Sequence, residues 1–179
     1  KLQRLLEYIN GSRNLYQRLT TVVSLGIDAD VDVAFGVHHD GRSRTGGTDR
    51  VEENIIEAIS AWQKIVSKSS TEAELVGPTD TMTGTLHKKY FLEAQGHEIG
   101  PIKLHQDNLS TIKMIERGRP MHNRTRHIKI RYFFLHDYVR RNEIELEYTP
   151  TKEMLADILT KPLQGALFVK LRDRLLNIS

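Results

Sequence analysis

The stretch VDVAFGV at residues 31–37 sets one acid, Asp32, inside an apolar run. Its β-branched residues predict a strand, and the turn signal HHDG at residues 38–41 ends that strand. An ionised carboxylate in apolar surroundings is costly unless another group compensates its charge. Asp32 is therefore either a lone buried acid or, as the better interpretation, one member of a site that holds a cation.

Three further acids stand where other predicted elements begin or end. Glu74 closes SSTEAE at residues 69–74, a helix start with a hydroxyl N-cap, and Asp107 follows a short strand predicted over 102–106. Asp157 belongs to a helix predicted over 151–160. Acids in such positions can converge, and converging carboxylates repel unless a cation neutralises them. Because an all-oxygen site favours Mg²⁺, the four acids predict a metal-dependent phosphodiester hydrolase.

Each acid also has a simpler interpretation. Glu74 could complement the helix macrodipole in a first turn, and Asp107 could cap the helix that starts at residue 108. Asp157 could be an ordinary surface acid. All of these together would be a larger coincidence than any one alone.

The remaining pattern predicts alternating strands and helices. In the first half of the chain we expect a helix over 1–12, an extended stretch over 14–24, the strand over 31–37 and one or two strands within 48–66. A long helix follows from 69 to about 95, interrupted or bent near Gly77, Pro78 and Gly84. In the second half we expect strands over 102–106 and 144–148, and helices over 108–117, 127–139, 151–160 and 164–177. This order predicts an α/β fold with a mixed sheet.

The whole chain sets broad limits. Its 179 residues fit one domain, or one domain with a short piece of a neighbour, and the absent initiator Met suggests a fragment of a longer protein. With no cysteine, disulfides and thiolate-bound zinc are excluded and a reducing intracellular setting is permitted. No apolar run approaches the roughly 20 residues that span a bilayer, so we expect no membrane partner.

Positive charge is concentrated in one part of the chain. Residues 111–141 hold nine Lys or Arg against two acids, whereas the net charge of the chain is only +3. Such an excess attracts phosphate, although a solvated helix face would have a similar composition. Beside four metal-type acids, nucleic acid is the better interpretation.

Histidines and aromatic residues add no site of their own. The histidines, including the pair His38 and His39, show no zinc-type spacing and are predicted to be surface or core residues. Trp62, Phe133 and Phe134 are predicted to belong to the core.

Longer motifs carry a family resemblance. SSTEAE at 69–74, QDN at 106–108, RTRHIKIRYFF at 124–134 and ADILTKPL at 156–163 resemble the ribonuclease H domain of Ty1/copia-type retrotransposon Pol polyproteins. The stretch 31–38 is similar to the first-strand motif of that family. The opening residues resemble the tail of its reverse transcriptase. The resemblance implies a ribonuclease H-like fold, with a five-stranded mixed sheet flanked by helices, over residues 25–179, after a reverse transcriptase or connection tail over residues 1–24.

The resemblance also implies an activity and a set of roles. The family hydrolyses the RNA strand of RNA–DNA hybrids during reverse transcription with two Mg²⁺ ions, for which Mn²⁺ is an alternative. Asp32 would bridge both ions, Asp107 and Glu74 would hold one side and Asp157 the other, with Glu72 competing for the place of Glu74. The proposed phosphate contacts are Arg124, Arg126, His127 and Arg131.

The same resemblance implies partners and a location. The partners would be an RNA–DNA hybrid and the reverse transcriptase domain of the same polyprotein. We expect the cytoplasm, in a virus-like particle, with the nucleus as an alternative.

The chain also departs from the family pattern. Residues 48–59 do not match the glycine-rich strand expected there, a Trp is missing near Leu86, and no His precedes the last acid in the stretch YTPT at 148–151. Two other functions stay open: a decayed, non-catalytic copy that binds nucleic acid, and a nuclease of the same superfold that prefers DNA.

Overall fold

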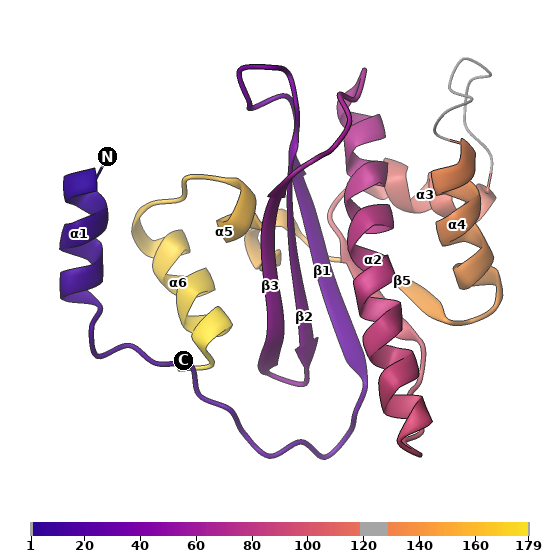
Figure 1. Ribbon diagram of the computed structural model, residues 1–179, viewed down its shortest axis with the longest axis horizontal. Coiled ribbons are helices and arrows are strands. Elements are labelled where there is room, and N and C mark those ends of the chain that lie inside the picture. Colours follow the sequence, from indigo (N-terminus) through magenta and orange to yellow (C-terminus); the bar gives the residue numbers. More distant parts are fainter. Residues whose placement is uncertain (1, 119–128, 179) are drawn as a thin grey trace.

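The computed structural model describes residues 2–118 and 129–178 and contains one five-stranded sheet (Figure 1). The strands are β1 (Ile27–Ala34), β2 (Arg44–Val51), β3 (Asn54–Trp62), β4 (Ile102–Gln106) and β5 (Ile144–Tyr148). Their order in the sheet is β3-β2-β1-β4-β5. The first three strands pair antiparallel, whereas β1 with β4 and β4 with β5 pair parallel. The predicted α/β fold with a mixed sheet is confirmed.

Apolar and acidic residues alternate along β1, so the two faces of the sheet differ in character. Ile27, Ala29 and Val31 lie in the main hydrophobic core, and residues two apart in a strand share a face. Asp28, Asp30 and Asp32 therefore share the opposite face. Acids on every second position of a central strand are unusual, and side chains from other elements contact them.

The main core lies between one face of the sheet and three helices. These helices are α2 (Ser70–Ala94), α3 (Leu109–Arg117) and α4 (Lys129–Arg140). Leu75, Met82 and Leu86 from α2 pack there with Ile115 and Leu135 from the other two helices. Each of these apolar side chains is almost completely buried.

The other face carries the C-terminal elements. They are a 3-10 turn, η2 (Thr151–Glu153), the single-turn helix α5 (Asp157–Thr160) and α6 (Gly165–Leu176). A Cβ added at Gly46 would lie 2.7 Å from the Ala156 carbonyl oxygen, beside α5, whereas one at Gly47 would lie 3.1 Å from Thr81 Cγ2 on α2. Because consecutive strand residues point to opposite faces, α2 and α5 cover opposite sides of the sheet.

The N-terminal helix α1 (Leu2–Gly11) stands beside the domain, away from the sheet (Figure 1). The chain after it is tied to β3 and α6, since Gln17 Nε2 donates to the Ile55 carbonyl at 2.7 Å and Arg18 N to the Leu176 carbonyl at 2.8 Å. No helix in the described residues is long and apolar enough to cross a membrane.

Three expected elements differ from those observed. The predicted strand over 31–37 spans residues 27–34, because Asp28 and Asp30 are neutralised by other side chains and so fit inside a strand. The predicted helix over 151–160 splits into η2 and α5, and the residues between them, Met154, Leu155 and Ala156, are buried. Helix α2 runs without interruption through Gly77 and Pro78, both of which are buried against the sheet.

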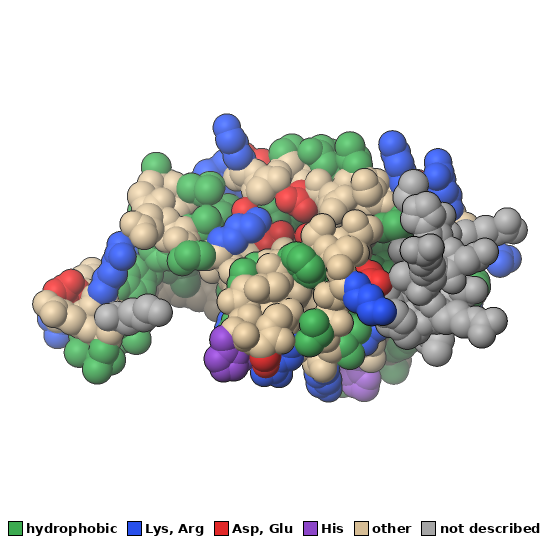
Figure 2. All heavy atoms as spheres, turned by 90° about the horizontal axis from the view of Figure 1, so that it is seen from above, with side chains coloured by type: hydrophobic (Ala, Val, Ile, Leu, Met, Phe, Trp, Pro, Cys, Tyr) green, Lys and Arg blue, Asp and Glu red, His purple; other side chains and the backbone are tan. Residues whose placement is uncertain are grey.

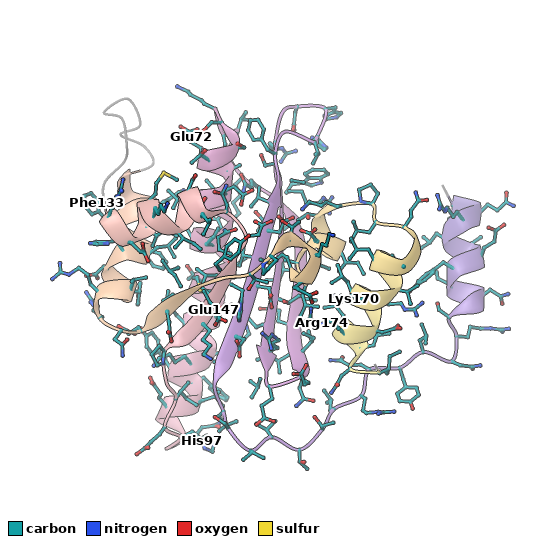
Figure 3. All side chains as sticks on the ribbon, turned by 180° about the vertical axis from the view of Figure 1, so that it is seen from behind. Glu72, His97, Phe133, Glu147, Lys170 and Arg174 are labelled. Atoms are coloured by element: carbon teal, nitrogen blue, oxygen red, sulfur yellow. The ribbon has the colours of Figure 1, made fainter. Side chains whose placement is uncertain are left out.

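The aromatic predictions were partly wrong. Phe133 is 55% exposed on the outer side of α4, where Figure 3 labels it. Phe134 packs against the core as expected. Trp62 is half-buried, with the Arg44 guanidinium stacked 4.0 Å from its ring centroid.

Candidate active site

The carboxyl end of β1 carries Asp32, which is almost completely buried. Thr160 Oγ1 donates a hydrogen bond to Asp32 Oδ2. Lys161 Nζ lies 3.3 Å from the same oxygen. Asp32 is thus held by two residues that follow each other at the end of α5.

Glu74 reaches this site from the first turns of α2. A Cβ on Gly77 would come within 2.6 Å of Val33 Cγ2, so the missing side chain lets α2 lie close against β1. Glu74 Oε2 is buried and has no hydrogen-bond partner among the described residues. Burial and the nearby charges of Asp32 and Asp107 raise the pKa of Glu74 to about 8.

The competing acid, Glu72, has a different task. Its Oε2 accepts a hydrogen bond from the Lys68 backbone N–H at 2.6 Å, while Ser69 Oγ accepts one from the Glu72 N–H. This reciprocal pattern caps the start of α2. Figure 3 labels Glu72 on that first turn. The geometry therefore favours Glu74 over Glu72 as the acid of the cluster.

Asp107 follows directly after β4. Asn108, not Asp107, caps α3, because its side chain accepts from the Ser110 and Thr111 N–H groups. The N-cap interpretation of Asp107 is therefore wrong. One carboxylate oxygen of Asp107 accepts a hydrogen bond from Thr151 Oγ1 at 2.8 Å, which links the end of β4 to the turn after β5.

Asp157 is the first residue of α5 and is almost completely buried. Lys161 Nζ donates to Asp157 Oδ1 at 2.6 Å. Burial raises the pKa of Asp157 even though the Lys161 ammonium lowers it. Since Gly46 pairs with Asp32 across β1 and β2 and lies under α5, the absence of a side chain there lets Asp157 approach Asp32.

Together these acids form one cluster. Ligand oxygens of Asp32, Asp107 and Asp157 all lie within 4.8 Å of one another. Asp32 and Asp107 line a hollow of about 380 Å³, together with Glu74 and Lys161. Figure 2 views the molecule from the end at which β1 finishes and shows acidic side chains gathered near the middle of that surface, beside a basic one. Folding thus brings together four acids that span 126 positions of the sequence.

The donor atoms of the cluster are compatible with divalent cation binding. Its acids offer carboxylate oxygens, and among the residues that the structure describes one of these buried oxygens has no hydrogen bond and a single ammonium group contacts the acids. Oxygen donors at this density are the ligands that Mg²⁺ and Mn²⁺ take in proteins. The assignment of each acid as a metal ligand stays a prediction.

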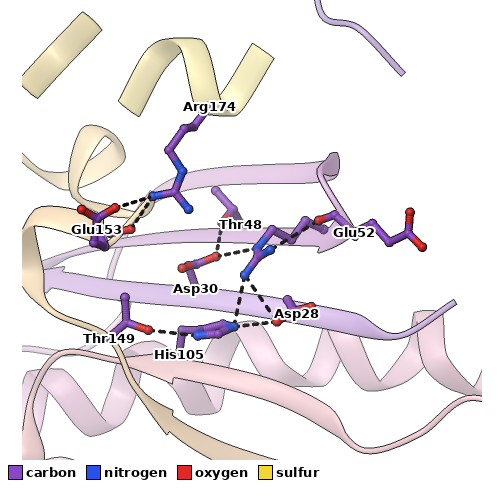
Figure 4. Close-up of polar contacts among 9 residues, drawn as sticks. Asp28, Asp30, Thr48, Glu52, His105, Thr149, Glu153 and Arg174 are labelled. Atoms are coloured by element: carbon purple, nitrogen blue, oxygen red, sulfur yellow. Dashed lines mark hydrogen bonds and ion pairs between the residues drawn. The ribbon is translucent and has the colours of Figure 1, made fainter. Parts of the chain in front are cut away.

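A second set of charges lies lower on the same face of the sheet (Figure 4). His105 Nε2 lies 2.7 Å from Asp28 Oδ1 and its Nδ1 lies 3.0 Å from Thr149 Oγ1. The Arg50 guanidinium lies 3.3 Å from Asp28 and 3.5 Å from Asp30. In this Asp28–Asp30–Arg50–His105 network one guanidinium contacts both acids.

Most of the predicted nucleic-acid contacts cannot be placed. Arg124, Arg126 and His127 lie outside the described residues. Arg131, at the start of α4, forms an ion pair with Asp80 of α2 at 2.7 Å. It lines a groove of about 680 Å³ between α2 and β3, which no sequence pattern predicted.

Sequence reasoning also missed the supporting residues. Lys161 and Thr160 stood inside the motif that contains Asp157, and their spacing of one turn from it could have indicated contact. The roles of Gly46 and Thr151 depend on the distances between elements far apart in the sequence, which no local pattern reveals.

Comparisons with known proteins identify relatives of the chain. No family model matches it. It is 30% identical over 171 residues to the Retrovirus-related Pol polyprotein from transposon RE1 of Arabidopsis thaliana, covering 93% of this chain and 12% of that protein. It is 31% identical over 132 residues to that from transposon TNT 1-94 of Nicotiana tabacum, covering 74% of this chain and 10% of that protein. The chain thus spans about a tenth of the length of these curated relatives.

Solved structures agree on the fold. LC11-RNase H1 in complex with an RNA/DNA hybrid gives a TM-score of 0.52 at 14% identity, covering 75% of this chain and 91% of that one. The RNase H1 of Halobacterium salinarum NRC-1 gives 0.50 at 13% identity, covering 70% and 86%. The Prototype Foamy Virus Protease-Reverse Transcriptase gives 0.52 at 12% identity, covering 82% of this chain and 22% of that one. These likenesses show a ribonuclease H fold.

Proposed function

This chain is a ribonuclease H-type domain related to copia-type retrotransposon Pol polyproteins, and from that premise we propose that it hydrolyses the RNA strand of RNA–DNA hybrids. One observation carries the proposal. Four acids from β1, α2, the end of β4 and α5 converge at one end of the sheet, and within residues 2–118 and 129–178 only Lys161 forms an ion pair with them. A structural cluster would have more internal cations than these residues supply.

The residues that would hold two Mg²⁺ ions are Asp32, Glu74, Asp107 and Asp157, with Asp32 central. Bound there, the ions would supply an activated water and stabilise the leaving oxygen of the scissile phosphodiester. Glu74 would have to lose a proton first, since its pKa is about 8 without a cation.

The surrounding hydroxyls and the ammonium would fix the geometry of the acids. Thr160 and Thr151 donate to Asp32 and Asp107, and so hold each carboxylate in one orientation. Lys161 contacts both Asp32 and Asp157 and would hold these two carboxylates close together when no cation is bound.

Recognition of the hybrid would depend on residues that line the hollow and on the basic segment of residues 111–141. Asn108, Ser110 and Tyr148 line the hollow and could contact sugar hydroxyls or phosphates of the RNA strand. Arg124, Arg126, His127 and Arg131 remain the proposed phosphate contacts. For Arg131 this requires leaving its ion pair with Asp80.

The reverse transcriptase domain of the same polyprotein is the proposed protein partner. Helix α1 supports this, because none of its residues is buried. Its apolar side chains Leu2, Leu5, Leu6 and Ile9 are each more than half exposed. An apolar face of this kind is typical of a helix that packs against another domain. Reverse transcription in a cytoplasmic particle is the corresponding proposal for location.

The test is hydrolysis of a hybrid labelled on its RNA strand, in Mg²⁺ or EDTA, beside a DNA duplex of the same sequence. We expect Mg²⁺-dependent cleavage of the RNA strand only, and loss of cleavage in Asp107→Asn. Asp137→Asn is the matched control, because Asp137 is exposed on α4 and pairs only with Arg141 in the structure.

Two results would reject the proposal. Binding of the hybrid without cleavage would favour the non-catalytic copy. Equal cleavage of the DNA duplex would favour a DNA nuclease of the same superfold.

A further inference from the structure

The loop between β1 and β2 is a closed turn with a fixed shape. His38 N donates to the Arg42 carbonyl at 3.1 Å, and Gly41 N donates to the His38 carbonyl at 2.9 Å. Gly41 has φ +80°, in the left-handed region that glycine adopts readily. Gly36 N donates to Ser43 Oγ at 3.1 Å, which closes the base of the loop. The side chains on its tip are therefore held close together by backbone contacts.

Three consecutive side chains on this tip carry metal-type donor atoms. His38, His39 and Asp40 each offer one ligand atom within 4.8 Å of the other two. The two imidazole centroids are 4.1 Å apart, and His38 Nδ1 lies 2.6 Å from Asp40 Oδ1. The sequence showed no zinc-type spacing because the closed turn, and not a helical or strand period, brings these donors together.

An ordinary surface network accounts for part of this arrangement. The Arg42 Nε–H donates to Asp40 Oδ2 at 2.7 Å, so His38, Asp40 and Arg42 form an ion-pair group. In the described part of the chain no hydrogen bond engages the ring nitrogens of His39. This ion-pair group does not include the second imidazole, that of His39, which packs edge-on against the first.

We propose that this loop binds one divalent transition-metal ion through His38, His39 and Asp40. Two imidazoles and a carboxylate are ligands of Zn²⁺, Ni²⁺ and Cu²⁺, whereas Mg²⁺ prefers oxygen alone. The loop and the four-acid cluster would therefore select different ions. The site is separate from the proposed nuclease chemistry.

The position of the loop indicates which elements a bound ion would hold together. The His38 ring packs 4.4 Å from the Trp62 ring, at the end of β3, and the Arg44 guanidinium covers Trp62. A bound ion would fix the loop tip against the last residue of β3. It would hold together the β1–β2 loop and the connection that leads into α2, the helix that carries Glu74.

Trp62 supplies a direct readout, because it is the only Trp in the chain. Cu²⁺ quenches indole fluorescence at short range and Zn²⁺ does not. The experiment titrates Cu²⁺ into the tag-free chain, with excess Mg²⁺ present to occupy the acid cluster. We expect quenching that saturates at about one equivalent, that EDTA reverses and that Zn²⁺ displaces.

Two variants and a control separate this site from other histidines. His39→Gln changes an exposed side chain and should weaken Cu²⁺ binding at least about tenfold, and Asp40→Asn should weaken it less. His97→Gln is the matched control, since His97 is exposed beyond the C-terminal end of α2, far from the loop (Figure 3).

Circular dichroism verifies that each variant folds. Quenching in His39→Gln that matches the unmodified chain, or quenching that never saturates, would overturn the proposal.

Discussion

Two groups of charges share one face of β1 and differ in how they are balanced. At the middle of the strand, Asp28 and Asp30 lie against Arg50 and His105, so each acid has a cation or a hydrogen-bond donor from the protein itself. At the end of the strand, Asp32 joins Glu74, Asp107 and Asp157, and Lys161 is the cation that contacts this group. In the first group the Arg50 guanidinium contacts both acids, whereas the second group has an excess of negative charge among the described residues.

This difference separates structural charge from functional charge. Buried acids persist in a fold when neighbours neutralise them, and an unbalanced set is retained at a cost to stability. The same strand thus carries acids that stabilise the sheet and an acid poised for a cation from outside. Removing an acid from the four-acid cluster should therefore impair cleavage, whereas removing Asp30 from the other group should not.

The largest expected effect is on catalysis at Asp32. Asp32→Asn should lower hybrid cleavage by about 10³-fold or more, because it removes the central carboxylate of the proposed metal site. Asp30→Asn, two residues earlier on the same face, should keep the rate within about tenfold. Both rates are measured with excess Mg²⁺ on folded protein. Equal losses in the two variants would contradict the division into two groups.

The next effect is on stability at Arg50, whose side chain is mostly buried. Arg50→Met leaves Asp28 and Asp30 without their guanidinium and should lower the free energy of unfolding by about 3–5 kcal/mol. Urea denaturation at neutral pH measures it. Arg141→Met is the matched control, because that ion pair with Asp137 is exposed and should contribute less than about 1 kcal/mol. A small loss at Arg50 would show that the network is not structural.

Local patterns predicted most of the fold. The apolar run after residue 30, the Ser69 cap and the turn glycines gave the order of elements, and the five-stranded mixed sheet was confirmed. The errors arose where tertiary contacts override local preference. The predicted strand began only after Asp28 and Asp30, yet Arg50 and His105, far away in the sequence, make these acids acceptable in a strand.

The candidate site was predicted as a set of residues and not as a geometry. The motifs identified Asp32, Glu74, Asp107 and Asp157, and the fold gathers them. No local pattern could show that Gly46 and Gly77 bring α5 and α2 close enough for this, since the relevant contacts join residues on different elements.

A smaller effect tests the charge balance at Glu74 through pH. Its pKa is raised from 4.5 to about 8, so the folded state binds the Glu74 proton more tightly than the unfolded state between these values. Stability should therefore fall as pH rises through that window. Glu74→Gln lacks this penalty and, without metal, should be more stable than the unmodified chain by about 1–3 kcal/mol near pH 8.

The measurement is denaturation in EDTA at pH 5 and pH 8. The advantage of Glu74→Gln should almost vanish at pH 5. Glu147→Gln, on the exposed edge of β5, should show no such trend. An advantage of Glu74→Gln that is independent of pH would indicate relieved packing in place of relieved charge.

The smallest effect concerns Lys161, the one cation among residues 2–118 and 129–178 that forms an ion pair with the acid cluster. Its ammonium lies 2.6 Å from Asp157 and 3.3 Å from Asp32. Because the lysine side chain is 35% exposed, solvent screening reduces its contribution, and Lys161→Met should cost about 1–2 kcal/mol in EDTA. Added Mg²⁺ should then raise the melting temperature of this variant more than that of the unmodified chain, because the ion replaces the lost positive charge. Lys170→Met, which breaks an exposed pair with Glu153, should give no extra response to Mg²⁺. If Lys161→Met loses stability that Mg²⁺ does not restore, the ammonium belongs to the fold, and the end of β1 is balanced like its middle.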